Sequence, residues 1–118
     1  MRASSLHICA LIPTYNTRRR VVDVVRRPRR YMQDIIVVAD GCTDDTLTLL
    51  QALDFPVTVV SYARNRGKGY ALKQGFRKAL EMGFEYVMTI DADGQHYPED
   101  IPLLVEEALL HPGHIIIG

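Results

Sequence analysis

Short apolar runs alternate along this chain with longer amphipathic stretches, and this alternation restricts the fold more than any other feature. The runs cover residues 6–12, 34–39, 57–62 and 86–90, and another begins at His114. Runs this short, rich in β-branched residues and nearly continuous, are typical of strands buried on both faces of a parallel sheet. Strands that alternate with helices predict right-handed crossovers. We therefore predict an α/β fold with a Rossmann-like, doubly wound and mostly parallel sheet.

Helical patterns fill the intervals near 21–28, 43–53, 72–83 and 101–108. Pro28 is expected to end or kink the first helix, because proline lacks the N–H that a helix interior needs. Thr43 is expected to cap the second helix. The 118 residues contain no linker or repeat, so a single domain is predicted.

The 14 basic and 14 acidic residues give a net charge of zero, which argues against a nucleic-acid binder that works through bulk charge. Residues 1–30 nevertheless hold eight arginines against Asp23 alone. The segment Arg18–Arg30 is therefore either a solvated helix face or a patch for peripheral contact with anionic lipid or an acidic partner. Two cysteines, no membrane-spanning run and no signal-peptide pattern predict a cytoplasmic protein, at most peripheral at the inner face of a membrane.

Doubly wound sheets bind ligands where their strands end, so the residues after each strand are the candidates for function. Pro13 is expected to lead the chain out of the sheet, and Tyr15 offers a ring that could stack on a base or cap the core. Asp40 either accepts N–H groups from a base or from backbone amides, or is a turn-forming residue beside Gly41. The glycine-rich segment 64–69, which contains Lys68, suits either phosphate contact or simple helix capping.

The segment after the fourth run carries two carboxylates, Asp91 and Asp93, followed by Gln95 and His96. Carboxylates at i and i+2 of an extended chain point to the same side and repel each other unless a cation lies between them. Oxygen ligands of this kind suit Mg²⁺ or Mn²⁺, and such an ion could bridge diphosphate oxygens. The alternative is a solvated acidic turn before a helix.

Four blocks in this order, IPTYN, IIVVADGCTDDT, RNRGKGYALKQGF and TIDADGQHYPEDIP, resemble the inverting glycosyltransferases of family two with the GT-A fold. The polyprenyl-phosphate, dolichol-phosphate mannose synthase-like members are the most similar. The resemblance implies binding of a UDP- or GDP-sugar and transfer to an acceptor such as a polyprenyl phosphate or a glycan.

The resemblance also implies roles for individual residues. Donor binding would fall to Pro13, Tyr15, Val38, Asp40, Lys68, Asp91 and Ala92. The metal, Mg²⁺ or Mn²⁺, would be held by Asp93 with Gln95 and Asp91. Thr17 and Ala39 depart from the acidic residues that the family often has at those places.

The family continues beyond the equivalent of Gly118 with an acceptor pocket and a general base. The resemblance thus implies that 1–118 is the nucleotide-sugar-binding part of a truncated domain, that the acceptor-binding part is absent, and that the chain holds no catalytic base. An unfinished sheet would leave an open edge and favour self-association.

Two other functions compete with this interpretation. A haloacid-dehalogenase-like phosphohydrolase would use Asp91 as nucleophile and Asp93 as acid/base, again with Mg²⁺. A non-catalytic nucleotide-sugar-binding module would need no base at all.

Overall fold

The computed structural model describes residues 8–18, 20–90 and 116–117. Five strands form one parallel sheet in the order β3-β2-β1-β4-β5. The strands are β1 (Ile8–Thr14), β2 (Ile35–Asp40), β3 (Thr58–Tyr62), β4 (Tyr86–Thr89) and β5 (Ile116–Ile117). The helices are α1 (Arg20–Arg29), α2 (Thr46–Gln51) and α3 (Lys68–Glu81). The predicted α/β class and parallel sheet are confirmed, whereas the helix predicted near 101–108 lies outside the described residues.

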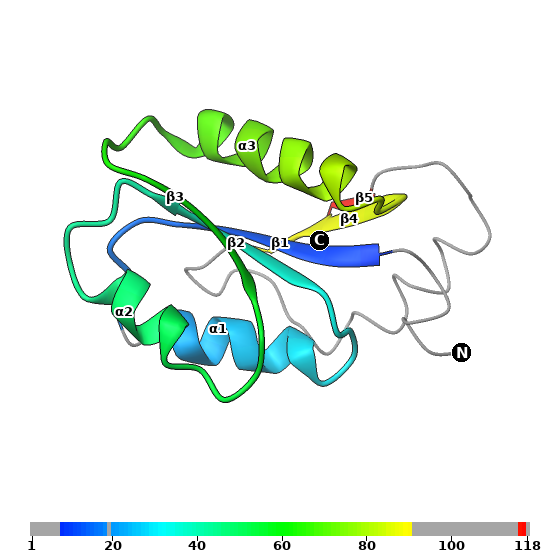
Figure 1. Cartoon of the computed structure of the whole chain (residues 1–118), viewed down its shortest axis with the longest axis horizontal. Coiled ribbons are helices and arrows are strands. Elements are labelled where there is room, and N and C mark those ends of the chain that lie inside the picture. The colour runs from blue at the N-terminus through cyan, green and yellow to red at the C-terminus, as the bar shows by residue number, and fades with distance from the viewer. Residues whose placement is uncertain (1–7, 19, 91–115, 118) are drawn as a thin grey trace.

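The sheet is a layer between helices (Figure 1). Helices α1 and α2 cover one face, and α3 covers the other. The chain winds outward from β1 through β2 to β3 and then crosses back to β4 on the far side of β1. The order therefore reverses between β1 and β4, which is the point where doubly wound folds bind ligands at the carboxyl ends of their strands.

The core lies on both faces of the central strands, which explains why their sequences are continuously apolar. Every residue of β2 is buried, and β1 exposes only Pro13 in part. On one face, Leu11 packs so closely under α3 that a Cβ added at Gly75 would overlap its side chain. Gly75 thus allows α3 to approach the sheet.

Pro13 does not leave the sheet, and this prediction is wrong. It lies within β1, in register with Val38 of β2. The N–H of Ala10 points toward β2, where it donates to Asp34 O at 2.9 Å, so the nitrogen of Pro13, three residues later, faces the β4 side. Pairing with β4 ends at Leu11, so no ladder hydrogen bond is lost there.

Two helix boundaries also differ from the prediction. Helix α1 continues one residue past Pro28, whose ring is buried in the last turn. Helix α2 begins at Thr46 rather than after a Thr43 cap. Instead, the carboxylate of Asp44 accepts the N–H of Thr46 at 2.9 Å. Within the described part of the chain, no helix has the length and apolar character needed to cross a bilayer.

Candidate functional site

The loops that follow β1 and β2 are joined through the side chain of Asn16. Its Oδ1 accepts the backbone N–H groups of Thr43 at 2.8 Å and of Asp44 at 3.3 Å. Its Nδ2 donates to Thr43 Oγ1 at 3.1 Å. Asn16 has a φ of 50°, a left-handed conformation that asparagine tolerates better than most residues. One side chain therefore fixes two loops at the carboxyl edge of the sheet.

Further contacts strengthen the same junction. The N–H of Arg18 donates to Thr46 Oγ1 at 2.9 Å, and the Cys42 thiol donates to Thr14 O at 3.7 Å. Burial acts to raise the pKa of Asp44, but hydrogen bonds from Thr46 and the charge of Arg18 outweigh it, so the pKa of Asp44 lies below its ordinary value. Asp44 is therefore a structural carboxylate that holds this junction in its charged form.

The loop after β3 is attached to Asp40, the last residue of β2. The Asp40 side chain is buried, and its carboxylate accepts N–H groups from Asn65 Nδ2 at 3.0 Å, Arg66 N at 2.8 Å and Gly67 N at 3.0 Å. Two carboxylate oxygens offer about four acceptor positions. Three of these are occupied by the chain itself, so Asp40 organises the loop that leads into α3.

Gly41 permits this attachment because the third loop lies directly against it. Its φ is +67°, and an added Cβ would overlap the backbone of Arg64 and Asn65. Glycine is needed here both for the left-handed conformation and for the close approach.

Aromatic rings extend the site beyond Asp40. The rings of Tyr62 and Tyr70 meet edge to face at 5.2 Å, and the guanidinium of Arg66 lies 4.7 Å from the Tyr70 ring centre. Burial, together with the neighbouring Asp40 carboxylate, raises the pKa of Tyr62. Tyr62 is therefore a neutral phenol at physiological pH.

The other residues predicted to bind the donor or the metal are exposed, buried, or outside the part of the chain that the structure describes. Tyr15 is half-exposed at 51 % beyond the end of β1, and Lys68 is exposed as the first residue of α3. Val38 is fully buried in the core beneath α3, so its side chain is not on a solvent-accessible surface. Asp91, Ala92, Asp93 and Gln95 lie outside the described residues.

Ile90 is the last described residue before the acidic motif. Ile90, the residue before Asp91, is buried and donates its N–H to Leu11 O at 2.9 Å. The described residues contain no group of three His, Cys, Asp or Glu side chains that could hold a metal. The Asp40 carboxylate is already bonded by three N–H donors of the chain itself.

Asn65 is the functional candidate that the sequence reasoning missed. The sequence does contain a hint of this role, because Asn65 stands between two arginines in the loop that follows the predicted strand 57–62. Its partner Asp40 is 25 residues away along the chain, however, and no local pattern links the two.

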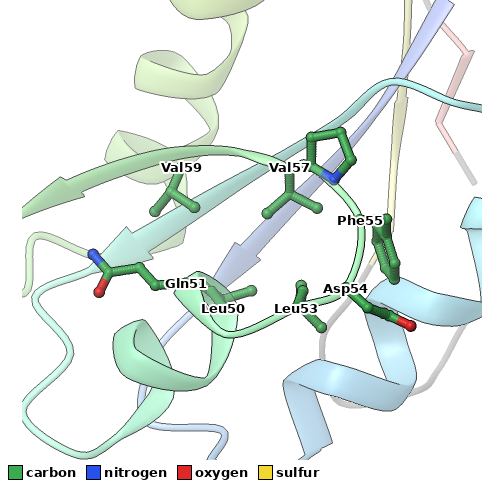
Figure 2. Close-up of a pocket in the computed structure, with 8 residues that line it drawn as sticks. Leu50, Gln51, Leu53, Asp54, Phe55, Val57 and Val59 are labelled. Atoms are coloured by element: carbon green, nitrogen blue, oxygen red, sulfur yellow. The ribbon is translucent and has the colours of Figure 1, made fainter.

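A separate groove of about 430 Å³ lies beside the edge strand β3 (Figure 2). Its wall is mostly apolar and comes from one continuous stretch, 50–59. Leu50 and Leu53 approach it from the α2 side, and Val57 and Val59 line it from β3. The groove is thus distinct from the three joined loops.

Residues 9–118 match a protein-family model described as glycosyl transferase family 2. The chain belongs to glycosyl transferase family 2. The phosphohydrolase alternative is therefore wrong, because the TIDADG block lies within a family 2 domain.

Several curated proteins are similar to this chain in sequence. A UDP-N-acetylglucosamine–dolichyl-phosphate N-acetylglucosaminyltransferase of Methanococcus voltae is 29% identical over 94% of this chain and 51% of its own length. A dolichol-phosphate mannosyltransferase of Pyrococcus furiosus is 34% identical over 96% of this chain and 33% of its own length. The chain thus spans between a third and a half of these relatives.

Solved structures support the fold. S. aureus TarS in complex with UDP superposes with a TM-score of 0.66 at 18% identity, over 92% of this chain and 33% of TarS 1-349. The complex of the same protein with UDP-GlcNAc gives 0.58 at 21% identity, over 92% and 32%. The GT-A fold expected from the sequence is therefore confirmed.

Proposed function

We propose that this chain is the donor-binding part of a glycosyltransferase that takes a nucleotide-diphospho-sugar and glycosylates a lipid-linked phosphate at the inner face of a membrane. The observation that carries the proposal is the joining of three strand-end loops around Asn16 and Asp40 in a chain of family 2. Relatives named for dolichyl-phosphate acceptors and structural neighbours solved with UDP and UDP-GlcNAc support the same class of substrates.

In this proposal the described residues bind and orient the donor. Tyr15 supplies an exposed ring on which a base can stack, and Pro13 and Val38, which are paired in register in β1 and β2, would support that site from the sheet. Asp40 Oδ1 accepts a single described N–H, so it retains capacity for one N–H from a base edge. Lys68 and the N–H groups at the start of α3 suit the diphosphate.

The acidic motif completes the donor site. Asp91 and Ala92 would lie against the ribose and diphosphate, and Asp93, Gln95 and Asp91 would hold Mg²⁺ or Mn²⁺. The metal would stabilise the negative charge that develops on the departing nucleoside diphosphate. A hydroxyl acceptor would also need a base that deprotonates it as it attacks, whereas a lipid phosphate attacks as an anion, and we assign the role of base to no residue of this chain.

Calorimetry with UDP-glucose, UDP-GlcNAc and GDP-mannose, each with and without Mn²⁺, tests the proposal. We expect one donor to bind more tightly with the metal, and Asp93→Asn to remove that gain without unfolding the protein. Asp23→Asn, an exposed change on α1, is the control. A folded sample that binds none of the donors would overturn the proposal.

A transfer assay separates a catalytic domain from a binding module. Labelled donor is mixed with undecaprenyl phosphate, and the lipid fraction is counted. Donor binding without transfer would support the non-catalytic alternative for the chain on its own.

A further inference from the structure

Helix α1 buries one narrow stripe and presents arginines over the rest of its surface. Val21, Val24, Val25 and Pro28 pack toward the sheet. The arginines of the helix and its C-terminal turn that are exposed are Arg20, Arg26, Arg27 and Arg30. Helix α1 lies on the opposite side of the sheet from α3 (Figure 1), so these arginines and the exposed charges of α3 are on different faces.

Two arginines of α1 are held by the segment that lines the groove beside β3. Arg26 forms an ion pair with Asp54 at 3.3 Å, and the Arg29 guanidinium lies 5.4 Å from the centre of the Phe55 ring. Both partners face α1 in Figure 2. These contacts place one flank of the arginine surface beside the apolar groove.

The other arginines have no such contacts. Arg20, Arg27 and Arg30 make no side-chain ion pair or hydrogen bond within residues 8–18, 20–90 and 116–117, and the acidic residue nearest to them on the helix is Asp23. With Asp54 also counted, the five arginines 20, 26, 27, 29 and 30 outnumber their acidic neighbours by three. Residues 31–90 carry seven acidic and six basic residues and are nearly neutral, so the excess positive charge of the described residues lies at α1 and its flanking turns.

We propose that the arginine face of α1 docks on the anionic head groups of a lipid bilayer, an inference that rests on the lipid-linked acceptor proposed above. Anionic leaflets attract arginines close to their surface, with a gain of about fivefold in binding for each residue. A bilayer is the expected partner rather than a nucleic-acid duplex, because the proposed acceptor is itself carried by a membrane lipid.

The direction of α1 makes this docking useful for transfer. The helix starts just after the carboxyl end of β1 and ends near the start of β2, so its first turn adjoins the three joined loops. A bilayer along α1 would therefore pass beside that edge of the sheet, one helix diameter (~10 Å) away. A phosphate carried by a membrane lipid would then lie on the same side of the protein as the first turn of α1.

Sedimentation with sucrose-loaded vesicles tests the inference on the whole chain. The vesicles are pure phosphatidylcholine or phosphatidylcholine with about a third phosphatidylserine. We expect binding to the anionic vesicles alone, with a loss in high salt. The double variant Arg27→Gln/Arg30→Gln should bind roughly 25-fold more weakly, at about fivefold for each arginine.

The matched control is Lys73→Gln/Arg77→Gln, which removes two exposed charges from α3 on the opposite face. Equal weakening by both double variants would show that total charge matters and not this face, and would overturn the inference. Failure of the wild-type chain to bind anionic vesicles, or tighter binding to an oligonucleotide duplex, would also overturn it. Donor calorimetry on the same samples tests the proposed function separately, because Arg27 and Arg30 have no assigned role in donor binding.

Discussion

The side-chain amide of Asn65 donates to Asp40 twice, to the backbone oxygen at 3.1 Å and to the carboxylate Oδ2 at 3.0 Å. One residue of the β3–α3 loop thus secures both the end of β2 and the buried carboxylate there. The N–H groups of Arg66 and Gly67 complete the attachment. Asp40 is therefore held in one orientation before any ligand arrives.

Asn65→Ala should destabilise the protein by ~1–3 kcal/mol, because it leaves a buried carboxylate with one donor fewer. The free energy of unfolding, measured in urea, checks this expectation. Gln33→Ala removes an exposed amide from the turn before β2 and should change stability by less than ~0.5 kcal/mol. Equal effects of the two variants would contradict the role of Asn65.

Gly41→Ala should cost more stability than Gly67→Ala, although both glycines have positive φ angles. At both positions an alanine would be strained by ~1–3 kcal/mol, since Gly67, with φ 96° and ψ 164°, also lies in a region that side chains rarely occupy. At Gly67 the added Cβ meets nothing within 4 Å, whereas at Gly41 it overlaps the backbone of Asn65. We expect this overlap to add ~1–3 kcal/mol, as overpacking does.

Thermal and urea denaturation of the two variants measure that difference directly. A Gly67→Ala protein as unstable as Gly41→Ala would show that backbone conformation alone sets the cost. The close approach of the two loops would then contribute nothing to the difference in unfolding free energy.

The lowered pKa of Asp44 predicts a loss of stability in acid. A carboxylate whose pKa is lower in the folded state contributes its full stability above its ordinary value near 3.8, and this contribution disappears as the pH falls through the folded value. The difference in unfolding free energy between wild type and Asp44→Asn should therefore be largest near neutral pH and shrink below about pH 4. Urea midpoints across this range provide the measurement.

Asp45→Asn is the matched control for the acid effect. Asp45 is exposed and makes no side-chain hydrogen bond with α2, which begins at the next residue. Its variant should follow the wild-type pH profile closely. A constant difference between wild type and Asp44→Asn at every pH would show that the charge of Asp44 contributes nothing.

Much of the fold could be predicted from the sequence, because its strands are short and apolar throughout. The pattern of β2 and β4 leaves hardly any other assignment, and parallel order follows from the helices between them. Chain order also placed Asp40 and the glycine-rich loop at one edge of the sheet. These inferences need only local periodicity and the handedness of crossovers.

The details of the site required contacts that local patterns do not encode. For Asp40 the sequence left two roles equally open, an acceptor of N–H groups and a turn-forming residue beside Gly41, and the structure shows that it accepts the backbone N–H groups of Arg66 and Gly67. Thr43 looked like a helix cap, but Asn16, 27 residues earlier, takes its N–H, and α2 starts later. In each case, a hydrogen bond between loops that are distant in sequence outweighed the local preference of the residue for a turn or a helix cap.

Gly75 and Gly69 lie on the same helix and should respond with opposite signs to the same substitution. Gly75→Ala drives a methyl group into the buried side chain of Leu11 and should destabilise by ~1–3 kcal/mol. Gly69→Ala meets nothing within 4 Å and replaces a poor helix former, so it should stabilise by ~0.5–1 kcal/mol. Urea denaturation decides both signs, and a stabilising Gly75→Ala would contradict the tight seating of α3 on β1. Since Gly69 adjoins Lys68, donor calorimetry on the more stable variant would then show whether space at the start of α3 serves the nucleotide rather than the fold.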